Sequence, residues 1–496
     1  MRNHRLPSLE NRKTSVALTD TDDTRLGRAI GPRASAYPAL SGIHALRDPR
    51  DAFAARVLLA RAAERSLDVQ YYIWRDDLTG TLLFDALLSA ANRGVRVRLL
   101  LDDNNTSGLD ATLAALDSHA NIEVRLFNPF VNRRLRLLGY ATDFGRLNRR
   151  MHNKSFTADN QVSIVGGRNV GDEYFGATHG VLFADLDVLA VGPVVRDVSR
   201  AFDEYWASAS SYPVDRILSG VTPARALEIA SKARHIESSP DALEYVRAVR
   251  ESSLVRALTE GTLDLDWAAT RMVCDDPAKG LGLAAPESLV YRRLKEVLGE
   301  PRSRLDLVSP YFVPTSAGVG WFTDLARRGV EVTILTNSLE ATDVSAVHAG
   351  YAKRRRPLLT EGIRLYELKR EASDGGASRS RGAGGSSGAS LHAKTFSIDR
   401  ARAFVGSFNF DPRSASLNTE MGFVIESQAL AGEIDETFQT SIPDSSYALR
   451  LSEGGEMSWV ERRGAESVRH DREPGTGVVR RAWVSLLSSL PIEWLL

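Results

Sequence analysis

The chain has 496 residues, 43% of them hydrophobic and 25% charged, which is the balance of an ordinary folded protein with room for more than one domain. Its 63 basic and 63 acidic residues cancel, so net charge favours no partner and any attraction to an anion must come from local clusters. A single cysteine, Cys274, excludes an internal disulfide and argues against a cysteine-based metal site.

The N-terminal segment, residues 1–40, is polar and charged, and we expect it to be loosely ordered. It has no apolar stretch of the kind found in a signal peptide. No part of the chain approaches the run of about 18 apolar residues that a transmembrane helix needs. We therefore expect no signal peptide and no membrane span.

Helices and strands are expected to alternate after this segment. Residues 51–65 have apolar positions at helical spacing, and residues 67–74 are rich in β-branched and aromatic residues, as in a strand. An apolar helix at 82–91 and strands at 95–101 and 122–127 follow. This alternation indicates an α/β layer.

The same pattern recurs in the second half of the chain, with strands expected at 305–312, 328–335 and 363–366. A repeat this long indicates a duplicated domain and not a solenoid. The expected fold class is α/β. Two homologous halves, each a mostly mixed β-sheet flanked by helices, are expected to pack pseudo-symmetrically with the active site between them.

The repeat also sets the expected boundaries. They are a loosely ordered segment 1–40, a first half 41–215, a mainly helical connection 216–285, a second half 286–445 and a C-terminal tail 446–496. The glycine- and serine-rich stretch 373–390 has the composition of a mobile loop. Its position just before a chemical motif suits a lid, and a tolerated surface insertion fits equally well.

Two copies of one motif carry the chemistry. The first half contains His152, Lys154 and Asp159, followed by Gly166-Gly167-Arg168-Asn169. The second contains His392, Lys394 and Asp399, followed by Gly406-Ser407-Phe408-Asn409. A lone His-x-Lys pair is usually a solvated surface feature, but two copies that share five residue types at one offset favour a site.

The spacing has a physical sense. In an extended strand, residues i and i+2 point to the same face, so each histidine projects with its lysine. A strand that hairpins back would bring Asn169 or Asn409 beside the same face. Two histidines suit phosphoryl transfer through a covalent intermediate, one attacking as the neutral base and one protonating the leaving group. The lysines and asparagines would neutralise the phosphate in place of a metal, so no cofactor is expected.

Both motifs match the HxKxxxxD signature of the phospholipase D superfamily. From about Ser41 onward the chain resembles the C-type bacterial cardiolipin synthases, in stretches such as LDVQYYIWRDD, RLNRRMHNKSFTADN, GASLHAKTFSID and NTEMGFVIES. The resemblance implies that His152 is the nucleophile and that His392 is the general acid and then the general base. It also implies a set of phosphate-binding residues, namely Lys154, Lys394, Asn169, Asn409 and Ser407.

The resemblance further implies a carboxylate that orients each histidine. In the second half this would be Glu420, and in the first half Asp187 fits best, with Asp185 as the alternative. Asp159 and Asp399 belong to the catalytic signature, although in this family they are usually structural. Gly167 stands where many members have serine, so the two half-sites are expected to differ chemically.

The implied reaction is transfer of a phosphatidyl group to phosphatidylglycerol, with phosphatidylglycerol or phosphatidylethanolamine as donor. Six arginines between Phe130 and Met151, interleaved with apolar residues, suit an interface with anionic lipid, as do Lys353-Arg354-Arg355-Arg356 and the tail from Arg480 to Leu496. We expect a peripheral protein on the cytoplasmic face of the bacterial inner membrane.

Two other functions use the same residues. A phospholipase D would hydrolyse phospholipid in this pocket, and a nuclease of the superfamily would bind nucleic acid through the arginines. The balanced charge and the apolar neighbours of the arginines argue against a nucleic-acid partner. A non-catalytic membrane scaffold is disfavoured because both motifs are intact.

Overall fold

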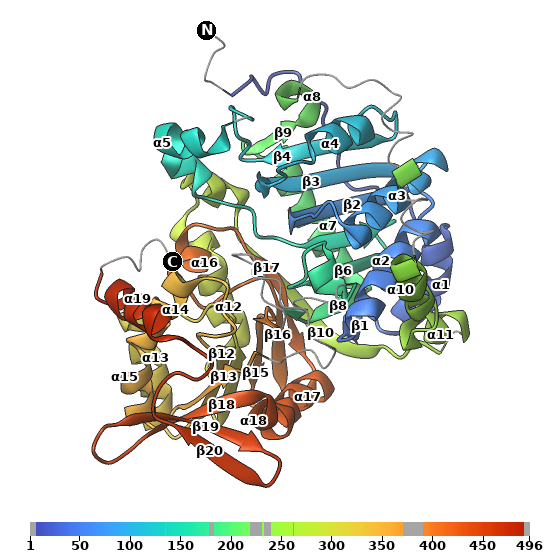
Figure 1. Ribbon diagram of the computed structural model, residues 1–496. Coiled ribbons are helices and arrows are strands. Elements are labelled where there is room, and N and C mark those ends of the chain that lie inside the picture. The colour runs from blue at the N-terminus through green and yellow to red at the C-terminus, as the bar shows by residue number, and fades with distance from the viewer. Residues whose placement is uncertain are drawn as a thin grey trace. The chain divides into compact units, whose positions relative to one another are not determined.

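The computed structural model describes residues 6–133, 135–177, 183–218, 231–232, 240–260, 262–370 and 390–490. The chain divides into two compact units (Figure 1). Unit 1 comprises Met1–Ala177, Asp187–Arg293 and Leu417–Phe423, and unit 2 comprises Thr178–Leu186, Leu294–Ser416 and Val424–Leu496. Each unit therefore includes a short segment from the other half of the sequence.

The sheet of unit 1 is mixed. Its order is β10 (Asp266–Cys274), β1 (Ser41–Leu46), β8 (Asp187–Val191), β6 (Val162–Gly166), β5 (Ser155–Ala158), β2 (Ser66–Ile73), β3 (Arg96–Asn105), β4 (Ile122–Phe127) and β9 (Ser211–Pro213). Strands β2, β3 and β4 run parallel, and the other pairings are antiparallel. The three strands expected in the first half are thereby confirmed.

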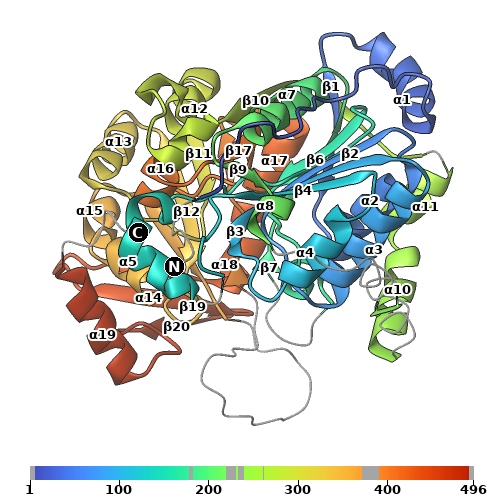
Figure 2. The same ribbon diagram turned by 90° about the horizontal axis from the view of Figure 1, so that it is seen from above.

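Helices cover both faces of this sheet. Figure 2 shows α2 (Pro49–Ala62), α3 (Leu78–Asn92) and α4 (Asp110–Asp117) on one side and α7 (Pro193–Ala207) on the other. Helix α2 begins where the side chain of Asp48 accepts backbone N–H groups and Pro49 occupies the first turn. Its apolar face is fully buried against the sheet, so the core of unit 1 lies between these layers.

Smaller elements complete unit 1. They are α1 (Arg25–Ala36), α5 (Arg136–Leu147), α6 (Asp172–Phe175), α8 (Val214–Ile217), α10 (Pro240–Arg250), α11 (Ser253–Glu260) and the 3-10 turns at Pro277–Leu281 and Pro286–Ser288. The N-terminal segment is attached to the unit, because Arg12 Nη1 donates to the carbonyls of Ser208 (2.7 Å) and Ser211 (2.9 Å). The connection expected to be mainly helical also holds β10, which pairs antiparallel with β1 and extends the sheet.

Unit 2 repeats the central topology. Its sheet order is β16 (Arg402–Gly406), β15 (Thr395–Ile398), β11 (Arg304–Val308), β12 (Glu331–Asn337), β13 (Arg364–Leu368), β18 (Ser446–Leu451), β19 (Met457–Arg463) and β20 (Glu466–His470). The order β16-β15-β11-β12-β13 matches β6-β5-β2-β3-β4, and the three central strands are again parallel. The expected duplication of a mixed α/β unit is confirmed.

The remaining elements are α12 (Val290–Leu298), α13 (Ser316–Arg327), α14 (Ser345–Ala352), α15 (Arg355–Thr360), α16 (Pro412–Ser416), β17 (Met421–Glu426), α17 (Gln428–Gln439), α18 (Ser441–Ser445), α19 (Val478–Ser488) and the short pair β7 (Phe183–Ala184) and β14 (Ser390–Leu391). The glycine- and serine-rich stretch lies outside the described residues except for Ser390. Among the described residues, no helix combines the length and the apolar character needed to cross a bilayer.

Two of the regions expected at a membrane, the basic cluster at 353–356 and the C-terminal tail, are partly buried in the protein. The tail begins with the β18–β20 meander, and α19 packs through Val484 and Leu487 onto Leu339 and Ala349. In the basic cluster at 353–356, Arg355 is buried between Glu367 (2.8 Å) and Glu473 (2.5 Å). The final residues, 491–496, lie outside the described part of the chain.

Candidate active site

A β-hairpin carries each motif. The β5–β6 hairpin turns at Asp159 and Asn160, and the β15–β16 hairpin turns at Asp399 and Arg400, all four residues having positive φ. Aspartate and asparagine tolerate this left-handed conformation better than most residues. The turns therefore depend on the aspartates of the signature.

Asp159 ties its hairpin to the start of β2, and Asp399 ties its hairpin to the start of β11. The carboxylate of Asp159 accepts the backbone N–H groups of residues 64, 65 and 66 at 2.8 to 3.2 Å. Asp399 accepts those of residues 302, 303 and 304 at 2.8 to 3.1 Å. Burial acts to raise the pKa of Asp399, but these N–H donors hold it below its ordinary value. A four-residue strand separates each aspartate from its lysine and histidine, so both aspartates serve the hairpin.

His152 is paired with a buried carboxylate within unit 1. Its Nδ1 lies 2.8 Å from Oε2 of Glu420, whose side chain is completely buried. The segment 417–423 brings this glutamate to the histidine, since the N–H of His152 donates to the carbonyl of Thr419 at 2.9 Å. His152 itself is 6% exposed. A proton on Nδ1 directed at the carboxylate leaves the lone pair of the ring on Nε2, which is the nitrogen that would act as base or nucleophile.

Asp275 fixes the backbone of Glu420. Its Oδ2 accepts the N–H of Glu420 at 2.8 Å, and its own N–H donates to the Glu420 carbonyl at 3.0 Å. Burial raises the pKa of Asp275 to about 6, although Lys279 forms an ion pair with it at 2.8 Å. Asp275 is not among the site residues predicted from the sequence. One feature of the sequence could have indicated it, because Asp275 directly follows an apolar stretch that ends at Cys274.

His392 has the equivalent arrangement within unit 2. Its Nδ1 lies 2.6 Å from Oδ2 of Asp185 and 2.9 Å from Nζ of Lys394. The backbone N–H of His392 donates to the carbonyl of Ala184 at 2.9 Å, beside the parallel β7–β14 pair. The short segment 178–186 therefore supplies the carboxylate partner of this histidine.

The expected assignment of the carboxylates is corrected by these contacts. Glu420 contacts His152, and Asp185 contacts His392. Asp187, the residue expected to orient His152, instead forms an ion pair with Arg56 at 2.7 Å. The reason is its position in β8, where it faces Arg56 of α2 and also accepts the N–H of Arg168 at 3.1 Å. Its oxygens are occupied by this buried structural pair.

The lysines lie close to their histidines, as the i, i+2 spacing predicts. Nζ of Lys154 donates to the carbonyl of His152 at 2.5 Å, and Nζ of Lys394 donates to that of His392. Tyr72 also belongs to this cluster, because its ring contacts His152 edge-on at 4.9 Å and Nζ of Lys154 lies 5.6 Å from its centre. Tyr72 is not among the site residues predicted from the sequence, although strand alternation places it on the face opposite the core residue Tyr71.

The phosphate-binding candidates differ between the units. The side chain of Asn169 accepts the N–H of Ile73 at 3.2 Å and donates to Tyr174 at 3.0 Å, which fixes it at the end of β2. Ser407 is fully buried, and Oδ1 of Asn409 is buried without a hydrogen-bond partner among the described residues. This oxygen is an acceptor, so Asn409 could contact a phosphate oxygen only through its amide nitrogen.

The residue after Gly167 adds to this asymmetry. Arg168 is buried and donates to the carbonyls of Leu46 (2.8 Å) and Arg47 (2.7 Å), whereas Phe408 occupies the corresponding position in unit 2. The described residues include no cluster of three or more histidine, cysteine or carboxylate side chains able to hold a metal ion. Within each unit, the residues present are an imidazole, its carboxylate partner and an ammonium group.

Comparisons with known proteins agree with this construction. A family model described as "Cardiolipin synthase, PLD-like domain" matches residues 58–206 and 294–442, the two repeats. Cardiolipin synthase C of Escherichia coli K12 is 54% identical over 473 residues, 95% of this chain and 100% of the relative. Cardiolipin synthase A of Pseudomonas aeruginosa is 26% identical over 79% of this chain and 65% of the relative.

A solved structure shares the fold. The phosphatidylserine synthase of Haemophilus influenzae Rd KW20 has a TM-score of 0.56 at 14% identity and covers 85% of this chain and 92% of its own. The chain belongs to the cardiolipin synthase family of proteins with phospholipase-D-like domains. It is an enzyme of the phospholipase D superfamily, which confirms the resemblance identified in the sequence.

Proposed function

We propose that the protein is a cardiolipin synthase that transfers a phosphatidyl group to phosphatidylglycerol through a phosphohistidine intermediate. The observation that carries this proposal is the pair of histidines, each with Nδ1 on a buried carboxylate and a lysine beside it. The family and the 54% identical relative support the choice of cardiolipin as product. Phosphatidylglycerol and phosphatidylethanolamine are the donors that fit.

In the first step, Nε2 of His152 attacks the phosphorus of the donor. The bond from phosphorus to the glycerol or ethanolamine oxygen breaks, and His392 gives that oxygen its proton. In the second step, His392 takes the proton from the terminal hydroxyl of phosphatidylglycerol. The resulting alkoxide attacks phosphorus and displaces His152, which returns both histidines to their starting states.

The other polar residues stabilise charge during both steps. Lys154 and Lys394, with Ser407, Asn169 and Asn409, would bind the non-bridging phosphate oxygens, whose charge grows in the transition state. Glu420 and Asp185 would hold the correct tautomer of each ring and stabilise its protonated form. Asp159 and Asp399 would act only through the hairpins that present the lysines. The protein would work at the cytoplasmic face of the inner membrane as a peripheral enzyme.

The test is product analysis with labelled phosphatidylglycerol, with and without phosphatidylethanolamine. Cardiolipin should form with the wild-type protein and not with His152→Ala, and acid-labile phosphate should be trapped on His152. His119→Ala, which changes a histidine remote from both motifs in the sequence, is the matched control and should be fully active. Phosphatidic acid as the only product would identify a hydrolase instead, and phosphate trapped only on His392 would reverse the two roles.

A further inference from the structure

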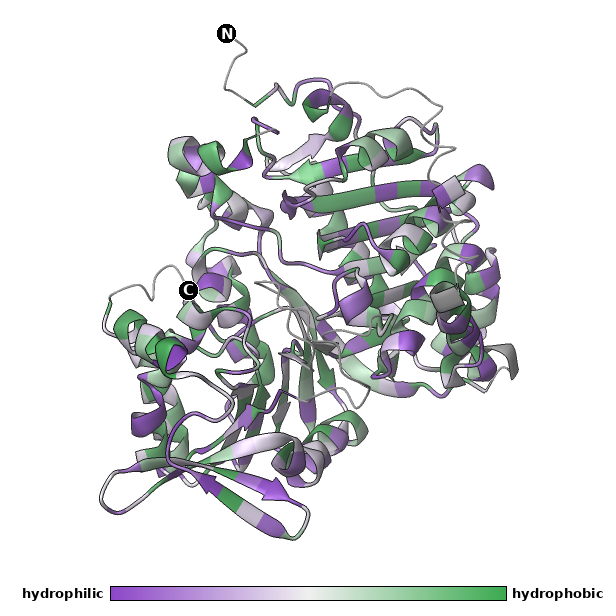
Figure 3. Cartoon of the chain, viewed as in Figure 1, coloured by the Kyte–Doolittle hydropathy of each residue, from purple (hydrophilic) through white to green (hydrophobic). Residues whose placement is uncertain are grey.

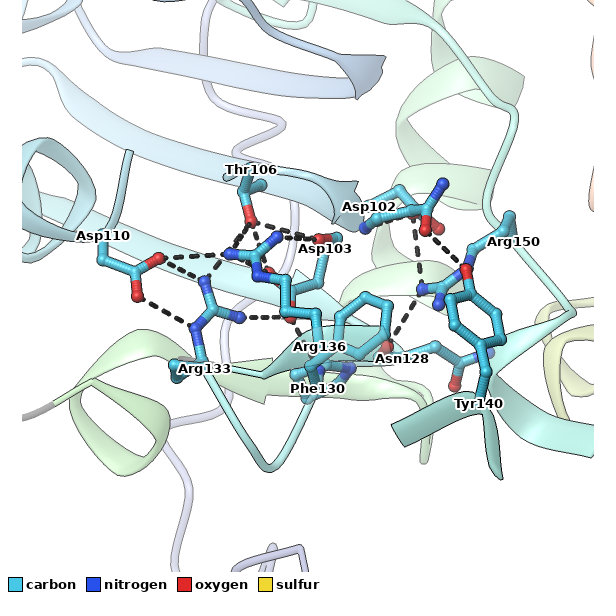
Figure 4. A network of polar contacts seen from close by, with 12 residues as sticks. Asp102, Asp103, Thr106, Asp110, Asn128, Phe130, Arg133, Arg136, Tyr140 and Arg150 are labelled. Carbon is cyan, nitrogen blue, oxygen red and sulfur yellow. Dashed lines mark hydrogen bonds and ion pairs between the residues drawn. The ribbon is translucent and has the colours of Figure 1, made fainter. Parts of the chain in front are cut away.

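Among the described residues, the arginines that precede His152 do not form the lipid-facing surface expected from the sequence. Residues 129–149, here called the excursion, leave the sheet after β4, form α5 and return just before His152. Arg133 forms ion pairs with Asp103 and Asp110, and Arg136 donates to the Asp103 carbonyl at 2.9 Å. Figure 4 shows both guanidinium groups turned toward these aspartates.

The other described charges of the excursion are also neutralised or directed at the protein. Asp143 and Arg146 pair with each other at 2.6 Å, and Arg149 donates to the carbonyl of Lys279 at 3.3 Å. Residue 134 lies outside the described residues. The described arginines therefore contact the protein, and not anionic headgroups as the sequence suggested.

The excursion is fixed at its base. Asn128 donates to the carbonyls of Arg149 (2.9 Å) and Gly280 (2.8 Å), which joins the start of the excursion to its end. Arg150 donates to the Asn128 carbonyl at 3.1 Å and lies 3.5 Å from Asp102, whose other oxygen accepts the N–H of Met151 at 2.8 Å. Figure 4 shows Asn128, Arg150 and Asp102 at this base. The residue after Met151 is His152, so this base is shared with the proposed nucleophile.

The inner face of the excursion is packed. The ring of Phe130 is 2% exposed and lies under Arg136 (5.5 Å) and Arg150 (5.0 Å). Tyr140 contacts the same ring edge-on and donates its hydroxyl to Asn104 at 2.7 Å. These contacts determine which side of α5 faces the protein.

Apolar side chains occupy the outer face. Leu137 is 84% exposed, Leu135 58% and Leu138 54%, and Phe144 and Val131 are 44% and 38% exposed. Figure 3 shows hydrophobic residues along α5, which stands beyond the ends of β3 and β4 in Figure 1. A set of exposed apolar residues on one short segment marks an interaction site, because water would otherwise contact all of this surface.

We propose that the outer face of the excursion inserts into the boundary between headgroups and acyl chains of a phospholipid bilayer. The choice of a bilayer rests on the proposed function, since both substrates carry acyl chains that must leave a membrane to reach His152. The surface is continuous with the backbone that carries that histidine, and its described charges are satisfied within the protein. Binding should therefore be hydrophobic and insensitive to salt.

The first experiment measures sedimentation of the full chain with vesicles of phosphatidylcholine alone and of phosphatidylcholine with phosphatidylglycerol, at low and high salt. The double variant Leu137→Ser and Leu138→Ser should bind both vesicles about tenfold more weakly at either salt concentration, since two apolar side chains no longer leave water. The matched control is Leu243→Ser with Val16→Ser, two residues that are 56% and 66% exposed outside the excursion. The control should bind as the wild type does.

Turnover of a short-chain phosphatidylglycerol that dissolves as monomers separates this inference from the proposed function. The leucine variant should keep this turnover and lose activity only on vesicles. Failure of the wild type with both substrates would remove the proposed function, while vesicle binding would still test the inference. Loss of the monomer reaction with normal vesicle binding would overturn the inference, since the excursion would then belong to the catalytic scaffold.

A label gives a direct readout of insertion. Cys274 is buried, so Leu137→Cys provides an accessible thiol for an environment-sensitive fluorophore. Its emission should shift to the blue with vesicles and be quenched by brominated acyl chains, whereas the same label at Leu243→Cys should not respond. The absence of a response at residue 137 would overturn the inference. A response without lipid that follows self-association, measured by light scattering, would also overturn it and would indicate that a second copy of the chain covers this face.

Discussion

At the scale of single residues, the two histidines depend on carboxylates that are fully buried. Glu420→Gln should slow formation of the phosphohistidine by on the order of 10²- to 10⁴-fold, because the ring loses its orientation and the partner of its positive charge. Asp185→Asn should act on His392 and slow both proton transfers to a similar degree. Rapid-quench kinetics of the adduct measure the first effect.

A control makes this prediction specific. Glu426→Gln changes an exposed carboxylate at the end of β17 and should leave the kinetics and the pH profile unchanged. If Glu420→Gln lowers substrate affinity but leaves the rate of adduct formation intact, the glutamate does not position His152.

Asp102 should give the protein a measurable dependence of stability on pH. Burial raises its pKa to about 6, and Arg150 and the N–H groups of Asn104 and Met151 only partly oppose this. The folded protein therefore binds a proton between about pH 4 and 6 where the unfolded chain does not, so the contribution of Asp102 to stability falls as pH rises through this range.

The comparison with Asp102→Asn isolates this group. Between pH 6 and pH 4 the wild type should gain about 3 kcal/mol in free energy of unfolding relative to the variant, from a shift of about two pKa units. Urea unfolding at several pH values measures the difference. A difference that stays constant with pH would show that Asp102 is already ionised in acid.

The site chemistry also predicts no requirement for a divalent metal. In the proposed mechanism, Lys154, Lys394 and the asparagines would supply the charge stabilisation that a metal gives in other phosphoryl-transfer enzymes. Activity should survive dialysis against EDTA, assayed as cardiolipin formed from phosphatidylglycerol. Complete loss that one particular metal ion restores would refute this account.

The proximity of each lysine to its histidine could be predicted from the sequence, because the repeat places the same residue types at the same offset. The carboxylate partner of each histidine could not be predicted in this way. A constant offset shows which residues of the two repeats are equivalent, but it does not show which of the two units each residue packs into. Glu420 and Asp185 each follow a motif in the sequence, yet each contacts the histidine of the other motif. That exchange depends on tertiary contacts of residues 417–423 and 183–186.

At the scale of elements, the strands of the repeat could be predicted from their β-branched and aromatic runs. Strand β10 could not, because it lies after two helices and its pattern of burial is irregular. The excursion shows a second limit. Composition showed arginines among leucines, but only the partners in β3 and α4, Asp103 and Asp110, determine which of them face the protein.

These arginine pairs should contribute to stability. Arg133→Gln with Arg136→Gln leaves the buried carboxylate of Asp103 without its main cationic partners, which should lower the free energy of unfolding by about 2–4 kcal/mol. Thermal unfolding measures this loss, and hydrogen exchange should increase in α5 first. Arg247→Gln, whose side chain is 80% exposed, is the matched control.

The opposite result has a clear meaning. Unchanged stability, together with weaker binding to anionic vesicles at low salt only, would restore the electrostatic interpretation drawn from the sequence. The ion pairs of Arg133 and Arg136 would then make no contribution to stability.

At the scale of the whole molecule, each unit needs a segment encoded in the other half of the chain. A fragment of residues 1–293 lacks Glu420, and a fragment of residues 294–496 lacks Asp185. Each should therefore fail to form or turn over the phosphohistidine alone, and co-expression of both should restore activity in part. Full adduct formation by fragment 1–293 alone would show that the pairing of His152 with Glu420 is dispensable.

The exchanged carboxylates have an evolutionary consequence. After a gene duplication, one copy can usually decay while the other keeps the activity. Here a change in one copy removes the partner of the histidine in the other, so selection acts on both copies together. A reading-frame error late in the gene, before codon 420, would disable the first motif although every codon of that motif is intact. The two repeats are therefore expected to diverge in their surfaces and in neighbours such as Arg168 and Phe408, and to retain both histidines and both carboxylates.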